Sequence, residues 1–307
     1  MKTKEHIAVL GYGSQGRAIA LNLRDSGYRV VVGLRKKSAK RVVAGRDGLI
    51  IGSIPEAARG AGIIIVAVSD DAHKQVLNDD LFGGLDTRPW LIFLHGATIH
   101  FGLVKPPKDI PVALLAPHAP GLAVRANYLN KQPYSAFYAV HRGPKTSGIE
   151  MLTKLARAIG IPKTHLVRTT IADEAVGDLF GEQAVLCGGL ARLLKFGFET
   201  LVDAGYPPQN AYLEVAFQID LIVNLVRRHG LAGMFERISP MARYGSAVNG
   251  PKVITSRAKA DMKKVLADIE SGAFMRRADR AGLKVSAKDM EKLLSRPFDR
   301  QVKRFSR

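Results

Sequence analysis

Residues 6–34, HIAVLGYGSQGRAIALNLRDSGYRVVVGL, decide the fold of this chain. The apolar run 6–10 predicts a buried strand, and a glycine-rich turn follows it. Residues 18–27 predict a helix that ends at its glycine, and residues 28–34 predict a second strand. A strand, a turn, a helix and a second strand form the βαβ unit of an open parallel sheet. We therefore predict an α/β chain that begins with a Rossmann-type doubly wound sheet.

The turn in this unit contains glycines in the G-x-G-x-x-G spacing, at Gly11, Gly13 and Gly16. In a dinucleotide site the first glycine permits the tight turn and the second lets the backbone approach a pyrophosphate. The third lets the helix pack on the strand. The phosphates then lie at the positive end of the helix dipole. Between a predicted strand and a predicted helix, this spacing indicates a dinucleotide site rather than a simple turn.

The residues after the second predicted strand indicate which dinucleotide is bound. An NAD site places Asp or Glu there to hold the ribose hydroxyls, whereas residues 33–40, GLRKKSAK, contain no carboxylate. Arg35, Lys36, Ser38 and Lys40 offer cations and a hydroxyl, which suit a 2′-phosphate. We predict NADPH as the cofactor. A solvated basic loop is the alternative, and its position directly after the strand argues against it.

Further apolar runs predict additional strands at 62–71, 90–96, 112–121 and 133–142. Polar side chains at their carboxyl ends gather at one edge of the sheet, where ligands bind. Asp70, His95 and His118 are therefore site candidates. A single histidine is usually structural, but two at equivalent strand ends favour a functional role. A helix at 146–160 and a short extended segment at 165–171 complete a predicted nucleotide-binding domain at residues 1–171.

Residues 172–307 form a predicted second domain that is helical. Helices are expected at 173–204, 208–229, 239–246 and 255–271, and the fold of 272–307 stays open. In the first helix Glu174, Asp178 and Glu182 stand four residues apart, which places three carboxylates on one α-helical face. Stacked acids repel one another, so they predict a site for a hard divalent cation. The alternative is a partly exposed helix with incidental acids.

Composition narrows the class of protein. The chain has 307 residues, 47% hydrophobic and 24% charged, which is typical of a globular protein with two domains. Its one cysteine, Cys187, excludes an internal disulfide and suits a reducing compartment, and we expect it in the core. A strand begins at once after the first residues, which leaves no room for a signal peptide, and no apolar stretch is long enough to span a membrane. We predict a cytoplasmic protein.

The net charge of +19 needs a physical reason. Residues 252–307 carry 16 Lys/Arg and 7 Asp/Glu, so about half of the excess lies in the C-terminal tail. This tail contains no nucleic-acid-binding motif and no interleaved aromatic residues. A positive field that attracts an anionic cofactor and substrate is therefore favoured over nucleic-acid binding.

Six segments resemble the ketol-acid reductoisomerase family in its short-chain form. They are GYGSQGRAIALNLRDSG (11–27), FLHGATIHFG (93–102), DLFGEQAVLCGGL (178–190), LVDAGYPPQNAYLE (201–214), GLAGM (230–234) and YGSAVNGPKVI (244–254). The resemblance covers roughly residues 5–271, and the segment that begins at Asp178 is the most specific. Members of this family convert a 2-aceto-2-hydroxy acid to a 2,3-dihydroxy acid with NADPH and two Mg²⁺ ions. An alkyl group migrates before the hydride is transferred.

The resemblance also implies roles for individual residues. Asp178 would bridge both metals, Glu182 would bind one, and Glu214 of the partner subunit would serve the second. His95 and Glu174 correspond to active-site residues, and Ser239 to a contact of the substrate carboxylate. The NADP-binding positions are Tyr12, Gly13, Ser14, Gln15, Arg35, Ser38 and Gly121. Because the helical domains of two subunits intertwine in this family, the implied unit is a homodimer or a higher homo-oligomer that acts on a small anionic keto acid.

This chain departs from the family pattern at site positions. His118 stands where the family has a lysine, and Gln218 stands where it has an acid four residues after Glu214. Arg243 adds a cation near the substrate position. These changes keep two other hypotheses open: a diverged paralogue that reduces a 2-keto or imino acid without alkyl migration, and a non-catalytic or nucleic-acid-binding protein on the same scaffold. The intact acids Asp178, Glu182 and Glu214 argue against the non-catalytic hypothesis.

Overall fold

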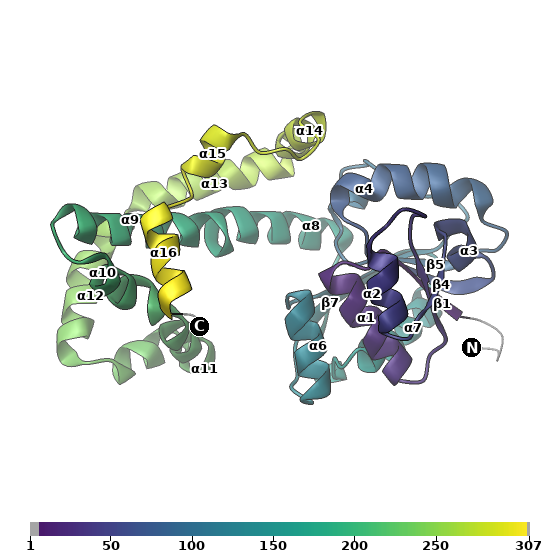
Figure 1. The fold of residues 1–307 in the computed structure, drawn as a ribbon, viewed down its shortest axis with the longest axis horizontal. Helices are drawn as coiled ribbons and strands as arrows, with labels where there is room; N and C mark the ends of the chain where they lie inside the picture. The colour runs from purple at the N-terminus through teal and green to yellow at the C-terminus, as the bar shows by residue number, and fades with distance from the viewer. Residues whose placement is uncertain (1–5, 306–307) are drawn as a thin grey trace. The chain divides into compact units, whose positions relative to one another are not determined.

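The computed structural model describes residues 6–305. The chain divides into two compact units, residues 1–177 and 178–307, whereas the predicted domain boundary is at residue 171 (Figure 1). Residues 1–5 of the predicted first domain and residues 306–307 of the second lie outside the described residues.

The first unit contains an eight-stranded sheet in the order β3-β2-β1-β4-β5-β6-β7-β8. The strands are β1 (His6–Leu10), β2 (Val30–Gly33), β3 (Ile50–Gly52), β4 (Ala61–Val66), β5 (Trp90–Phe93), β6 (Val112–Pro117), β7 (Ala136–Arg142) and β8 (Leu166–Arg168). Neighbouring strands are parallel except β6 and β7, which pair antiparallel. The order 3-2-1-4-5-6 is that of a doubly wound dinucleotide fold. The predicted fold class is confirmed.

Alternate residues along the strands supply the cores on the two faces of the sheet. In β1, Ile7 and Val9 pack into one buried cluster, and Ala8 and Leu10 pack into the other. The helical segments of this unit are α1 (Ser14–Asp25), α2 (Lys40–Arg46), α3 (Ile54–Ala58), α4 (Asp70–Lys74), η1 (Gln75–Leu81), η2 (Phe82–Gly84), α5 (Ala97–His100), α6 (Gly121–Leu129), α7 (Lys145–Ala158) and η3 (Lys163–His165). Each face of the sheet is therefore covered, as a parallel sheet requires.

Several predicted strands are longer than the observed ones: those predicted at 90–96 and 112–121 end at Phe93 and Pro117. The strand predicted at 62–71 ends at Val66, and Asp70 lies instead in the first turn of α4. The reason is that α4 begins directly after Ser69, which has an extended backbone, and that acidic residues in the first turn of a helix favour its positive end. Strand β3 is not predicted at all, because its three residues are too few for a periodic pattern.

The single helix predicted at 173–204 consists of three segments: α8 (Ile171–Phe180), a π-helical segment η4 (Gly181–Leu186) and α9 (Gly188–Asp203). A Cβ at Gly188 would lie 2.2 Å from the carbonyl oxygen of Gln183, and one at Gly189 equally close to that of Ala184. The glycine pair is therefore what permits the wider turn. The backbone amide of Cys187 donates to the carbonyl oxygen of Glu182, so the widened turn follows Glu182.

The second predicted helix, 208–229, is also divided. It comprises α10 (Pro208–Tyr212), the π-helical segment η5 (Leu213–Phe217) and the first part of α11 (Ile219–Arg237). Gly230 has a non-helical backbone inside α11, one residue after the predicted end. The remaining long helices are α12 (Pro240–Val253), which is longer than predicted, and α13 (Ser256–Glu270).

The C-terminal residues, whose fold the sequence leaves open, form α14 (Ala273–Arg280), α15 (Ala287–Glu291) and α16 (Arg296–Phe305). Phe298, Val302 and Phe305 form one stripe of α16 and pack against the small core of the helical unit. Ring centroids of Tyr212 and Phe298 lie 5.4 Å apart. Cys187, predicted to be in the core, is exposed on the single chain, as are its neighbours Val185 and Leu186. Among the described helices, none is both long and apolar enough to cross a membrane.

Candidate functional site

The glycine turn forms a cradle at the carboxyl edge of the sheet. Gly11 has φ +97°, and a Cβ there would lie 2.6 Å from the carbonyl oxygen of Ala67. A Cβ at Gly16 would lie 2.6 Å from the carbonyl oxygen of Gly11, whereas one at Gly13 would meet no atom within 4 Å. No side chain caps the start of α1, so its amide groups face this open space. The cradle fits the pyrophosphate of a dinucleotide.

The loop after β6 lies directly against this turn. Gln15 Nε2 donates a hydrogen bond to the carbonyl oxygen of Ala119 at 2.7 Å. A Cβ at Gly121 would lie 2.2 Å from the carbonyl carbon of Ser14, so the loop can approach α1 only with glycine there. His118 stays exposed on this loop, with its ring edge-on to Phe137 at a centroid distance of 4.3 Å.

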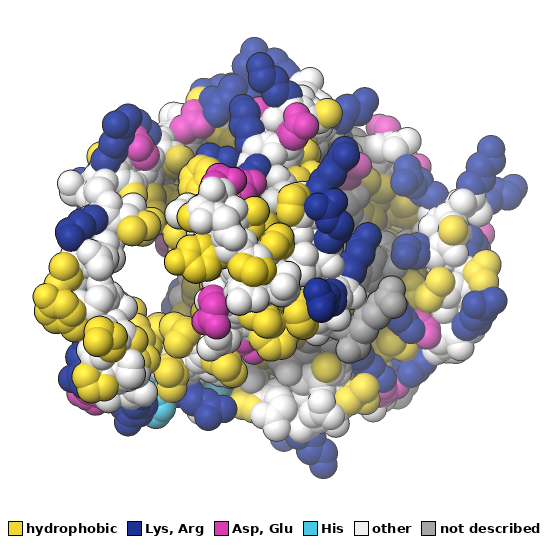
Figure 2. All heavy atoms as spheres, turned by 60° about the vertical axis from the view of Figure 1, so that its left-hand side comes forward, with side chains coloured by type: hydrophobic (Ala, Val, Ile, Leu, Met, Phe, Trp, Pro, Cys, Tyr) yellow, Lys and Arg dark blue, Asp and Glu magenta, His cyan; other side chains and the backbone are white. Residues whose placement is uncertain are grey.

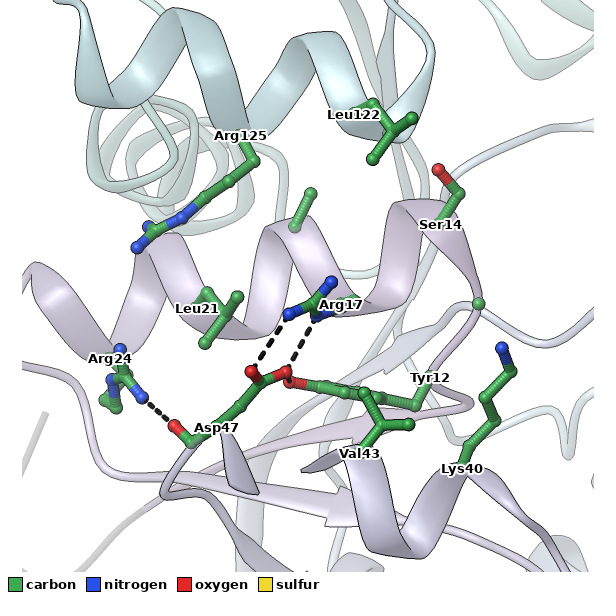
Figure 3. Close-up of a pocket in the computed structure, with 13 residues that line it drawn as sticks. Tyr12, Ser14, Arg17, Leu21, Arg24, Lys40, Val43, Asp47, Leu122 and Arg125 are labelled. Carbon is green, nitrogen blue, oxygen red and sulfur yellow. Dashed lines mark hydrogen bonds and ion pairs between the residues drawn. The ribbon is translucent and has the colours of Figure 1, made fainter. Parts of the chain in front are cut away.

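A groove of about 540 Å³ runs beside α1, between α2 and α6 (Figure 3). On its floor Asp47 accepts hydrogen bonds from Arg17 Nε at 2.7 Å and Nη2 at 2.9 Å, and from the Tyr12 hydroxyl at 2.7 Å. The hydrogen bond from Arg17 lowers the pKa of Asp47. Burial, together with Asp47, raises the pKa of Tyr12. Asp47 thus ties α1 and the residue between the first two glycines to the end of α2.

Asp47→Asn is expected to lower the melting temperature at neutral pH, because an amide cannot replace a carboxylate that accepts from Arg17 and Tyr12. The pKa of Asp47 is depressed in the folded state. Its contribution is therefore present above the unfolded pKa of about 3.9 and is lost as the pH falls through the folded value. Thermal unfolding of both proteins from pH 7 to pH 3 should show the difference shrinking below about pH 4. A difference that is constant over this range would contradict the ion-pair account.

The basic loop follows β2 at the same edge of the sheet. Arg35 Nη1 donates to Gln75 Oε1 at 3.3 Å, and Ser38 Oγ accepts from the backbone amide of Lys40. Lys36 is exposed, and Lys40 lines the groove in Figure 3. These predicted residues therefore surround the position at which the second strand ends.

His95 and Glu174 form a pair within the first unit. Nδ1 of His95 lies 3.3 Å from Oε1 of Glu174, and the amide of Gly96 donates to Oε2 at 2.7 Å. Glu174 is only 4% exposed, and the next residue of its helix, Ala175, is fully buried. With both carboxylate oxygens accepting, the proton of this hydrogen bond resides on Nδ1. This fixes the tautomer of the neutral ring, in which Nε2 is the acceptor nitrogen.

Sequence reasoning misses a buried histidine, His73, beside this pair. His73 Nδ1 lies 3.0 Å from Thr98 Oγ1, and its Nε2 lies 3.1 Å from the carbonyl oxygen of Val68. Burial lowers the pKa of His73. His73 stands three positions after Asp70. The one sequence signal for it is that its segment follows a predicted strand.

The candidate metal ligands belong to the second unit. Asp178 lies in the last turn of α8, Glu182 lies in η4, and Glu214 lies in η5. Within residues 6–305 no three His, Cys, Asp or Glu side chains form a group able to hold a metal ion. Glu174 is instead engaged by His95 and by the amide of Gly96, and the metal-binding roles of Asp178, Glu182 and Glu214 stay predictions. The remaining carboxylates fit a hard cation chemically, but one chain does not assemble them.

Two further predicted residues lie in the helical unit. Gln218 is exposed and its Nε2 donates to the carbonyl oxygen of Leu213 at 3.4 Å. Ser239 caps α12, with its Oγ accepting from the amide of Ala242 at 3.1 Å. The predicted contact of Ser239 with the substrate stays a prediction.

Comparison with known proteins decides the family. Residues 1–165 match the family model described as acetohydroxy acid isomeroreductase, NADPH-binding domain, and residues 171–304 match that described as ketol-acid reductoisomerase, C-terminal domain. The chain belongs to the ketol-acid reductoisomerase family. The resemblance drawn from the six segments is thereby confirmed, and the protein is a member of a family of NADP-dependent oxidoreductases.

Relatives support this assignment over most of the chain. A ketol-acid reductoisomerase (NADP(+)) of Beutenbergia cavernae is 42% identical over 274 residues, which cover 89% of this chain and 80% of that protein. The solved structure of an NADH-preferring ketol-acid reductoisomerase from an uncultured archean is 33% identical. It has a TM-score of 0.92 and covers 98% of this chain and 94% of its own. A semialdehyde dehydrogenase NAD-binding protein from Cupriavidus necator shares the fold alone, with 21% identity, a TM-score of 0.67, and coverage of 90% and 99%.

Proposed function

We propose that this family member is an NADPH- and Mg²⁺-dependent enzyme that converts 2-aceto-2-hydroxy acids to 2,3-dihydroxy acids. The observation that carries the proposal is the His95–Glu174 pair, held at the same sheet edge as the glycine cradle in a chain that matches the family in both halves. Residues 1–171 would bind the cofactor. Residues 172–307 would provide the metal ligands, the substrate contacts and the dimer interface.

The preference for NADPH rests on residues of this chain. One relative is named for NADP(+) and another as NADH-preferring, so family membership does not decide the preference. The loop after β2 carries Arg35, Ser38 and Lys40 and no carboxylate. Guanidinium and hydroxyl groups pair well with a phosphate, whereas an acid would be expected at an NAD site.

Asp178 and Glu182 of one chain, with Glu214 of the partner subunit, would hold the Mg²⁺ ions. Bound Mg²⁺ would supply Lewis-acid polarisation of the ketol oxygens. His95, oriented by Glu174 through Nδ1, would move the substrate proton at Nε2. Ser239 would contact the substrate carboxylate, and Arg243 would attract the anionic acid.

A homodimer, or a higher homo-oligomer, is proposed because the helical unit exposes large apolar side chains. Figure 2 shows them as yellow groups on its surface. On α11, Leu221, Ile222 and Val223 are exposed, and Met241 on α12 is 80% exposed. A monomer rarely leaves so many large apolar groups in water. A second copy of the chain would cover them and would bring Glu214 to the other subunit's acids.

The proposed reaction can be tested by the position of the transferred hydrogen. The protein is incubated with Mg²⁺, 2-acetolactate and NADPH deuterated at the transferred position, and the product is analysed by NMR. We expect 2,3-dihydroxy-3-methylbutanoate with deuterium on C2, because the methyl group moves before C2 is reduced. Deuterated 2,3-dihydroxy-2-methylbutanoate would show reduction without migration and would contradict the proposal.

Gln218 and His118 are the observations that favour the second candidate, a reductase without alkyl migration. An amide is a weaker ligand for Mg²⁺ than a carboxylate, and each further carboxylate offsets repulsion between two metal ions. The Gln218 amide nitrogen also donates a hydrogen bond to the carbonyl oxygen of Leu213. One metal site is therefore expected to be weak, and migration is expected to suffer more than reduction.

Gln218→Glu combined with His118→Lys is accordingly expected to raise turnover of 2-acetolactate by roughly tenfold, equivalent to about 1.4 kcal/mol of barrier. Turnover of a 3-hydroxy-2-keto acid, which needs no migration, should change much less. His118→Lys alone serves as the control for added charge. Calorimetric titration of Mg²⁺ with NADPH bound provides the second readout: two tight sites in the unaltered protein, with efficient acetolactate conversion, would refute this weak-site hypothesis.

A further inference from the structure

We propose that His73 is a positioning residue that fastens the cofactor-edge loop after β4 to the segment that carries His95. This inference rests on the proposed function, because it assigns His73 to the same reaction. His73 is 4% exposed and Thr98 is 3% exposed, so their hydrogen bond is shielded from water.

The hydrogen bonds of His73 determine its tautomer. The carbonyl oxygen of Val68 can only accept, so Nε2 must carry the ring proton. In the neutral ring Nδ1 is then an acceptor, and the Thr98 hydroxyl donates to it. Asp70 Oδ1 lies 3.9 Å from Nδ1, too far for a hydrogen bond. Burial, which lowers the pKa of His73, keeps the ring neutral and preserves this arrangement.

The two partners of His73 come from neighbouring loops at the carboxyl edge of the sheet. Strands β4 and β5 are adjacent and parallel, with Val66 opposite Phe93. Val68 follows β4 by two residues, and Thr98 lies in α5 three residues after His95. The His73 ring also packs edge-on to Phe93 at a centroid distance of 6.0 Å. His73 thus joins the loop that follows β4 to the segment that follows β5.

The segment around His95 is consequently held from two sides. Glu174 bonds the amide of Gly96 and the Nδ1 of His95 on one side. On the other side, His73 fixes Thr98, and through Val68 it fixes the backbone that leads to Asp70. A displacement of about 1 Å at a reacting group can cost on the order of 100-fold in rate. A rigid link between the cofactor loop and His95 therefore has a direct consequence for hydride and proton transfer.

A second buried histidine provides a matched control. His6 is 8% exposed and its Nε2 lies 2.8 Å from the carbonyl oxygen of Ala57, but it stands at the start of β1, at the opposite edge of the sheet. His73→Phe and His6→Phe each remove a buried imidazole and leave a backbone carbonyl unpaired. Both variants should lose thermal stability. Only the His73 variant should disturb the segment that carries His95.

The experiment compares kcat, KM for NADPH, melting temperature and backbone hydrogen exchange in both variants. We expect His73→Phe to lower kcat by about 10- to 100-fold and to speed hydrogen exchange in residues 94–98. His6→Phe should keep kcat within about twofold of the unaltered protein at a similar loss of melting temperature. His73→Gln, whose amide has a donor for Val68 and an acceptor for Thr98, should recover most of the lost rate. Thr98→Val removes only the hydrogen bond to His73 Nδ1. It should also lower kcat and speed hydrogen exchange in residues 94–98, but by less than His73→Phe does.

An unchanged kcat and exchange rate in His73→Phe, or an equal fall of kcat in His6→Phe, would overturn the positioning role. Failure of the proposed function is distinguishable, because it would appear as a lack of acetolactate turnover in the unaltered protein. Hydrogen exchange of residues 94–98 would still decide the role of His73 in that case, since faster exchange in His73→Phe alone supports the link.

Discussion

Asp178→Asn is expected to abolish Mg²⁺-dependent turnover and to leave NADPH binding intact. The substitution removes a carboxylate that the proposal assigns to both metal ions, while the glycine cradle lies in the other unit of the chain. Loss of an outer-shell partner of a metal typically costs about 10–100-fold, so loss of a bridging ligand should cost more. The measurements are the steady-state rate with 2-acetolactate and the affinity for NADPH by fluorescence titration.

Asp203→Asn, an exposed acid at the end of α9, is the matched control and should retain full turnover. Mixing inactive Asp178→Asn and Glu214→Gln subunits should restore part of the activity, because a mixed dimer would contain one site with every carboxylate intact. Loss of NADPH binding in Asp178→Asn would refute the assignment of the two functions to different domains. Absence of any restored activity after subunit exchange would refute the shared site.

Arg35→Asp combined with Ser38→Asp is expected to weaken NADPH binding by roughly 100-fold or more, because each charge-assisted hydrogen bond to the 2′-phosphate contributes about 1.5–3 kcal/mol. The acids also introduce repulsion. Binding of NADH, which lacks the phosphate, should change only a few-fold. Dissociation constants for both cofactors, measured at two salt concentrations, test this.

Lys37→Asp is the control for this loop, because it makes the same charge reversal at an exposed position that the proposal does not assign to the cofactor. If a general positive field attracted NADPH, this variant would weaken binding as much as Arg35→Asp does, and high salt would remove the difference. Equal affinity of the unaltered protein for NADPH and NADH would refute the proposal that this loop binds the 2′-phosphate.

Local patterns account for what the sequence predicts well. The glycine turn, β1 and α1 follow from a motif with a single structural context, and the long apolar runs of β4 and β5 are evident from composition. The predicted strand overruns β4 because residues 67–68 are also apolar, and α4 begins only after Ser69. The apolar stripe of Phe298, Val302 and Phe305 is present in the sequence, but the high Lys/Arg content of that segment obscures it.

The candidate site shows where such reasoning stops. An α-helical period predicts one continuous helix over 173–204, whereas the π-helical turn at Gly181–Leu186 requires close backbone contacts at the pair Gly188 and Gly189. His73 and Thr98 are 25 residues apart, and Tyr12 and Asp47 are 35 apart. Such contacts depend on strand order, which a single sequence does not specify at the level of side chains.

The sequence likewise does not predict which apolar residues of the helical unit stay exposed on a single chain. A sequence pattern identifies apolar residues on α11 but does not say whether they meet the same chain or a second one. The structure leaves Leu221, Ile222 and Val223 uncovered on a single chain. We therefore infer the oligomer from what one chain fails to bury.

The rate of NADPH oxidation with 2-acetolactate, measured against Mg²⁺ concentration and beside a 3-hydroxy-2-keto acid, tests the central proposal most directly. We expect oxidation with both substrates that depends on Mg²⁺ and disappears with a chelator, with the keto acid reduced faster because it bypasses the step that Gln218 weakens. Reduction of the 3-hydroxy-2-keto acid without any turnover of 2-acetolactate at saturating Mg²⁺ would contradict the proposal that this family member catalyses alkyl migration.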